Sequence, residues 1–117
     1  MEKLNFENFK NSVEITARVA PDRLNRPSIQ RVSKNMTRII TLLSTGKDRN
    51  GDRRPMLQIE VHVFGEGTAT PTKLSIDPQP GEYITIRGRL TQEVKEKGDK
   101  KFYNTIINAD EIVAVEQ

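Results

Sequence analysis

Residues 56–64 read Met-Leu-Gln-Ile-Glu-Val-His-Val-Phe, and this stretch decides the fold class. Its odd positions form an apolar series: Leu57, Ile59, Val61 and Val63. Its even positions after Met56 are the polar residues Gln58, Glu60 and His62, until Phe64 ends the run. Because successive side chains of a β-strand point to opposite faces, this alternation predicts a strand with one apolar face.

The same period-two alternation recurs along the chain, whereas helical periodicity is scarce. It predicts four further strands, at residues 13–19, 37–44, 83–90 and 102–107. Residues 112–115 then either continue the last strand past a kink or form a short closing strand. We therefore expect an all-β protein.

Glycine, proline and polar residues separate the strands. Four connections follow: a long mobile loop at 23–36, an extended hairpin arm at 45–54 that turns at Asn50-Gly51, an irregular connection at 65–81, and a second arm at 93–101. Asn-Gly is a strong turn signal because both residues tolerate positive φ. Within the irregular connection, only residues 72–76 have room for a single helical turn.

The order of strand, long loop, hairpin, connection and hairpin is that of a five-stranded OB-fold barrel with two long hairpin arms. Closing the barrel removes the strand edges that an open sheet would expose. On pattern alone, an SH3-like barrel or a small sandwich also fits. The 117 residues suffice for a single domain over 1–117, with a core at about 11–115.

The composition excludes several classes of protein. The chain has no Cys, so it has no disulfide, thiolate zinc site, iron–sulfur cluster or cysteine nucleophile. No window approaches the roughly 20 apolar residues of a membrane-spanning helix. Residues 1–6 lack the apolar core of a signal peptide. We expect a soluble, cytoplasmic protein that does not bind a membrane.

No constellation of catalytic residues is evident. His62 is the only histidine, and it has no second His or Cys with which to bind a metal, so we expect an exposed or hydrogen-bonding side chain. Asp110 and Glu111 are neighbours in a strand-like region and would point to opposite faces. No glycine-rich phosphate loop precedes a helix. The sequence therefore predicts no enzyme, no metal and no cofactor.

Positive charge is concentrated in one part of the chain. The 19 Lys and Arg exceed the 16 Asp and Glu by only three. Residues 18–54, however, contain ten basic and three acidic residues, a net charge of +7. Such a region attracts a polyanion, although a solvated basic surface is the alternative.

Phe64 is the main candidate for contact with a nucleic acid. It lies on the face of its strand that is otherwise polar, where a ring can stack on a base. The alternative is burial beneath the 65–81 connection. Tyr83, Arg87 and Arg89 share the polar face of another strand, and either bind a nucleic acid or form surface ion pairs.

The remaining cationic candidates lie on strand two and on the arms. They are Arg38 on the strand, Lys47, Arg49, Arg53 and Arg54 on the first arm, and Lys95, Lys97, Lys100 and Lys101 on the second. The second arm also contains three acidic residues, so we weight the first arm and, from the second, Lys100.

Four segments, at residues 11–19, 59–65, 84–90 and 98–103, resemble in order the bacterial single-stranded-DNA-binding proteins. The third strand ends in aromatic-Gly, the fourth in Gly-x-Leu, and the second hairpin has a Gly turn followed by aromatic residues. The resemblance implies an OB-fold that binds single-stranded DNA without strong sequence preference in replication, recombination or repair. It also implies a homo-oligomer, dimer or tetramer, with strand one often at a dimer interface.

The resemblance places a stacking aromatic at Phe64 and suggests a similar role for Phe102 or Tyr103. This sequence departs from the family in having no Trp, with Gln58 at the position of the usual one. The family's helix between strands three and four is not expected, and the chain ends at Glu116-Gln117 without an acidic tail. Such a divergent form fits a phage or mobile element. An OB-fold adaptor within a replication or restart complex, or an RNA-binding protein, is the alternative.

Overall fold

The computed structural model describes residues 9–115, which are all-β. The seven strands are β1 (Val13–Val19), β2 (Ile29–Ser33), β3 (Met36–Leu43), β4 (Leu57–Phe64), β5 (Lys73–Leu74), β6 (Tyr83–Lys97) and β7 (Lys100–Ala114). This part of the chain contains no helix, and therefore none long and apolar enough to cross a membrane. The expectations for residues 1–6 and for Glu116-Gln117 lie outside the described residues.

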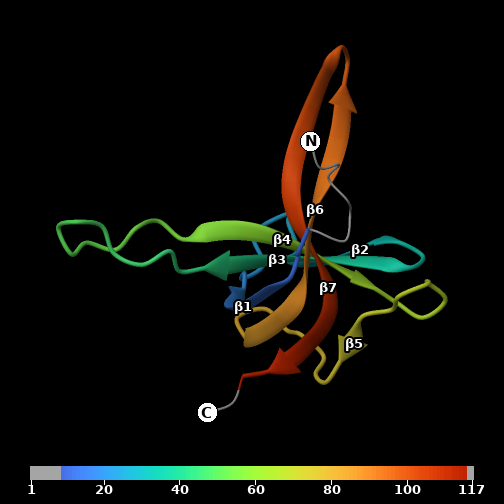
Figure 1. The fold of residues 1–117 in the computed structure, drawn as a ribbon, viewed down its shortest axis with the longest axis horizontal. Coiled ribbons are helices and arrows are strands. Elements are labelled where there is room, and N and C mark those ends of the chain that lie inside the picture. Colours follow the sequence, from blue (N-terminus) through green and yellow to red (C-terminus); the bar gives the residue numbers. More distant parts are fainter. Residues whose placement is uncertain (1–8, 116–117) are drawn as a thin grey trace, which may run out of the picture.

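Five of these strands close into a barrel. The ring runs β1–β6–β7–β4–β3 and returns to β1, where Arg18 pairs with Leu42 and Val19 with Thr41. All of its pairings are antiparallel except β4–β7, which is parallel at Val61 and His62. The predicted five-stranded barrel is confirmed (Figure 1).

The barrel interior is filled by aliphatic side chains from all five strands. Its buried cluster consists of Val19, Ile39, Val61, Val63, Ile84, Ile86, Ile107, Ala109 and Ile112. On β4, Val61 and Val63 of the predicted apolar face are buried in this cluster, but His62 between them is buried as well and Leu57 is exposed. Burial of these side chains is the main stabilising contribution of the fold.

Both predicted arms are present and extend from the barrel in different directions (Figure 1). In the first, Lys47 bridges to Arg53, and Gly51 adopts φ +83° beside Asn50. In the second, Lys97 pairs with Lys100 across a two-residue turn in which Gly98 has φ +65°. The radius of gyration, 16.2 Å, exceeds the roughly 13 Å typical of compact domains of this size, as expected for projecting arms.

Two predicted connections contain strands. The prediction of a long mobile loop at 23–36 is wrong, because residues 29–33 form β2 and pair with β3. The irregular connection at 65–81 contains no helical turn. Instead, Lys73 and Leu74 form β5 and pair in parallel with β7 at Glu111 and Ile112.

Strand β7 is continuous from residue 100 to 114, so the last two predicted strands are one. A β-bulge supplies the expected kink: Arg87 of β6 pairs with Glu111 while Gly88 pairs with Ala109. Asp110 is therefore the extra residue on β7. A bulge bends the strand and changes which residues face inward beyond it.

Gly88 is required at this bulge because the β7 backbone approaches it closely. A Cβ built there would overlap the carbonyl oxygen of Asn108. The obstacle is backbone, which cannot move away without breaking the pairing of the two longest strands.

We predict that Gly88→Ala lowers the free energy of unfolding by about 2–3 kcal/mol, because a side chain here forces the β6–β7 backbones apart. Urea unfolding followed by circular dichroism measures the change. Gly65→Ala is the matched control. Its φ is not positive and a Cβ would meet only the Asn35 carbonyl oxygen at 4.0 Å. Equal stability of the two variants would contradict this account of the bulge.

Candidate nucleic-acid interface

A groove of about 570 Å³ lies on the outer face of β3 and β4. Alternate residues of each strand form its floor: Arg38, Ile40 and Leu42 from β3, and Gln58 and Glu60 from β4. These residues are paired across the two strands, Arg38 with His62, Ile40 with Glu60 and Leu42 with Gln58. The alternation that directs Val61 into the barrel therefore directs the polar residues into the groove.

The segment 20–28, which connects β1 to β2, forms one side of the groove. Two of its cationic side chains, Arg23 and Arg26, line the groove together with Asn25. Neither arginine forms an ion pair within the described part of the chain. Their charges therefore remain available for an anionic ligand.

The second arm forms the other side, through Lys95 of β6. Lys95 pairs directly with Phe102 of β7, so the two side chains lie on one face of the arm. They also line a second hollow that continues along the arm. Phe102 is 48% exposed. The groove thus leads to an accessible aromatic ring.

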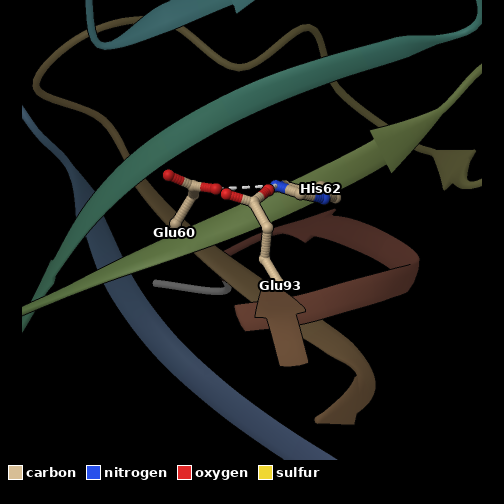
Figure 2. Close-up of side chains that lie close together, drawn as sticks. All are labelled: Glu60, His62 and Glu93. Atoms are coloured by element: carbon tan, nitrogen blue, oxygen red, sulfur yellow. Dashed lines mark hydrogen bonds and ion pairs between the residues drawn. The ribbon is translucent and has the colours of Figure 1, made fainter. Parts of the chain in front are cut away.

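An ionic network includes the charged residues of the groove floor, and Figure 2 shows its centre, Glu60, His62 and Glu93. His62 Nε2 is 2.7 Å from Glu60 Oε2 and 3.6 Å from Glu93 Oε2, which reaches across from β6. Arg38 Nη1 lies 3.9 Å from Glu60 Oε1 and Lys95 Nζ 3.3 Å from Glu93 Oε1. The network therefore holds two of the groove cations, Arg38 and Lys95, close to carboxylates.

Three residues of this network carry atoms that can ligate a metal ion. One ligand atom each of Glu60, His62 and Glu93 lies within 4.8 Å of the others. Each carboxylate already has a cationic neighbour, and the His62 ring hydrogen-bonds Glu60. The donor atoms are thus satisfied by protein groups. Of the two expected alternatives for His62, exposed or hydrogen-bonding, the structure shows the second, because the side chain is buried and bonds Glu60. Sequence analysis missed Glu93, because that contact joins strands distant in sequence.

Phe64 lies at the far end of the outer face of β4 and is half-buried. It does not line the groove. The connection after β4 returns beside its backbone: the Phe64 carbonyl accepts from the Thr72 amide at 2.8 Å, and its amide donates to Thr72 Oγ1 at 3.0 Å. The connection thus lies beside Phe64 and leaves this residue partly exposed.

Tyr83, Arg87 and Arg89 are exposed on β6 and do not line the groove. Arg87 Nε donates to Glu14 at 2.7 Å and Nη1 donates to Glu111 at 2.6 Å. The hydrogen bonds to Glu14 and Glu111 raise the pKa of Arg87 above its ordinary value. Of the two roles considered for Arg87, nucleic-acid binding and surface ion pairing, the structure shows the ion pairs.

The first-arm cations are exposed: Lys47, Arg49, Arg53 and Arg54. No ion pair holds any of them within residues 9–115. Lys100 is exposed beside the turn of the second arm. Tyr103 pairs with Val94 on the face of that arm opposite to Phe102, so the two aromatic candidates point in different directions.

Sequence analysis missed Arg23 and Arg26 as groove residues, because it assigned them to a mobile loop. The available signal was the Arg-Leu-Asn-Arg sequence between Pro21 and Pro27, which is typical of a tight turn. It also gave no weight to Lys95, whose place in the groove follows from the pairing of the second arm.

No family model and no curated protein matches the sequence. Solved structures do match. The Plasmodium falciparum SSB, in a complex with single-stranded DNA, superposes with a TM-score of 0.61 at 13% identity, over 95% of this chain and 92% of that one. The chain has the OB-fold of the single-stranded-DNA-binding proteins. The small single-stranded DNA-binding protein of Streptomyces coelicolor is also similar, with a TM-score of 0.56 at 14% identity over 86% and 90% of the two chains.

These similarities confirm the OB-fold expected of a single-stranded-DNA-binding protein and exclude the SH3-like barrel and the small sandwich. The sequence also predicted that the helix that single-stranded-DNA-binding proteins have between strands three and four is missing here. The 65–81 connection indeed contains no helix.

Proposed function

We propose that this protein binds single-stranded DNA without strong sequence preference and without catalysing a reaction. The observation that carries the proposal is the groove on β3 and β4, which has cationic side chains on both sides. Its cations are Arg23 and Arg26 on one side, Arg38 in the floor and Lys95 on the other side. The OB-fold of DNA-binding relatives adds support, since such folds bind oligonucleotides on this face.

The proposed ligand path continues from the groove onto both arms. The four cations of the first arm, which form no ion pair among residues 9–115, attract the phosphates. Phe102 offers a stacking surface on the second arm, and Phe64 offers another at the end of β4. Single strands exposed during replication, recombination or repair are the substrate class that we assign.

We predict that the protein binds oligothymidylate more tightly than duplex DNA or RNA of equal length. The logarithm of the binding constant should fall with the logarithm of salt concentration, with a slope of about −3 to −4. Each phosphate contact on a single strand contributes about −0.7, and we expect about four to six such contacts. Fluorescence titration over a salt series measures both quantities. Absence of binding to every oligonucleotide would favour an adaptor, and preference for RNA an RNA-binding protein.

Two arginine variants provide the control for this titration. Arg38→Ala removes a groove cation and should reduce the magnitude of the salt slope by about 0.7. Arg89→Ala removes a cation that lies outside the groove, 3.6 Å from Asp110, and should leave the slope unchanged. Equal reductions in both variants would place phosphates over β6 as well and contradict a path confined to the groove and arms.

The aromatic residues allow a second prediction. Phe102→Ala and Phe64→Ala should each weaken binding about 5- to 150-fold, because base stacking on a ring contributes about 1–3 kcal/mol. Tyr103→Ala should bind as the unmodified protein does, since its ring points away from Phe102. Titration at one salt concentration compares the three variants.

Thermal unfolding of the same variants separates binding from stability. Phe102 is 48% exposed and Tyr103 58%, so neither substitution creates a cavity. A Phe64→Ala variant that loses about 3–5 kcal/mol of folding stability would show that this ring is a packing residue beneath the connection. A larger binding loss for Tyr103→Ala than for Phe102→Ala would show that DNA contacts the Tyr103 face of the second arm and not the Phe102 face.

We further propose a homo-oligomer, a dimer or a tetramer. Strand β1 pairs with β3 only through Arg18 and Val19, so within the described chain its other edge is open from Val13 to Ala17. An open strand edge favours pairing with a second copy. Sedimentation velocity should report a dimer or tetramer at micromolar concentration. A monomer at every concentration tested would contradict the proposal.

A further inference from the structure

Residues 23–26 form a closed turn at the rim of the groove. The Arg23 amide donates to the Arg26 carbonyl at 3.0 Å, and the Arg26 amide donates back to the Arg23 carbonyl at 2.9 Å. Asn25 has φ +67°, a left-handed conformation that Asn tolerates better than most residues. Leu24 and Asn25 are therefore the two central residues of a tight turn.

The turn is fixed to the barrel. Asp22 Oδ1 accepts from the Ser28 amide at 2.9 Å and from Ser28 Oγ at 3.0 Å, and Ser28 is buried. The Ser28 carbonyl in turn accepts from the Ile40 amide of β3 at 2.8 Å. These bonds position the turn relative to the groove floor before any ligand binds.

Leu24 lies at the tip of this turn and is 93% exposed, more than any other large apolar residue in the described chain. Its neighbours Arg23, Asn25 and Arg26 all line the groove. A fixed turn thus presents an exposed aliphatic side chain on a segment whose two arginines line the groove. That arrangement matches a nucleotide, which combines a charged phosphate with an apolar base face.

We propose that the 23–26 turn binds a nucleotide, with Arg23 and Arg26 contacting phosphates and Leu24 packing against the face of an unstacked base. The inference rests on the proposed function. Leucine is among the apolar residues that insert between bases in other nucleic-acid complexes. The chain has only four Phe, two Tyr and no Trp, so an aliphatic contact supplements a small set of rings.

Salt-dependent titration with oligothymidylate distinguishes the two kinds of contact. Leu24→Ala should weaken binding about 5- to 20-fold at every salt concentration and leave the salt slope unchanged, because burial of an apolar side chain releases no counterions. The Arg23→Ala, Arg26→Ala double variant should instead reduce the magnitude of the slope by about 1.4, at 0.7 per phosphate contact.

Leu74→Ala is the matched control, because Leu74 is 50% exposed on β5 and does not line the groove. It should bind as the unmodified protein does. An oligonucleotide of equal length made of abasic sites tests the base contact directly, and on it Leu24→Ala and the unmodified protein should bind equally. Thermal unfolding confirms that all variants remain folded.

Three results would overturn the inference: unchanged oligothymidylate binding by Leu24→Ala, an equal loss on the abasic strand, or a change in self-association alone, which would make Leu24 a contact between copies. If Arg38→Ala weakens binding while Leu24→Ala does not, the proposed function stands and only this inference fails. If the unmodified protein binds no oligonucleotide, the proposed function fails.

Discussion

The barrel wall and the second arm are one continuous hairpin, formed by β6 and β7, and the bulge beside Gly88 makes this possible. On β7, Ile107 and Ala109 face the core at odd positions, yet the next core residue is Ile112. The extra residue, Asp110, shifts the alternation by one, so that Ile112 points inward and Glu111 outward. Without this shift a carboxylate would face the core, at a cost of several kcal/mol.

Beyond the bulge, the same alternation decides what the arm presents to the groove. Glu93, Lys95 and Phe102 lie on one face, whereas Val94 and Tyr103 lie on the other. Glu93 then reaches His62, which is 6% exposed, and links the arm to β4. The β6–β7 register that is set at the bulge beside Gly88 therefore determines where Lys95 lies in the groove.

The sequence predicted those elements whose residues alternate clearly, and β4 is the best example. The prediction failed for β2 (Ile-Gln-Arg-Val-Ser). This strand pairs only with β3 and leaves Val32 half exposed, so its sequence has no alternation imposed by burial. The groove was predicted only in part. Arg38 follows from strand alternation, whereas Lys95 and Glu93 reach the groove through tertiary contacts, which local periodicity does not encode.

The balance of charges indicates how affinity would be divided. Two carboxylates, Glu60 and Glu93, lie close to Arg38 and Lys95, so the floor of the groove has little net charge. Attraction at distances near the Debye length of about 8 Å then depends more on cations that form no ion pair among residues 9–115, including those of the first arm and of the 23–26 turn. A nearly neutral floor between cationic borders suits a single strand, whose phosphates and bases require different surroundings. In the proposed binding mode, most phosphates would follow the borders and one would contact Arg38, while bases would lie over Ile40 and Leu42, the apolar residues of the floor.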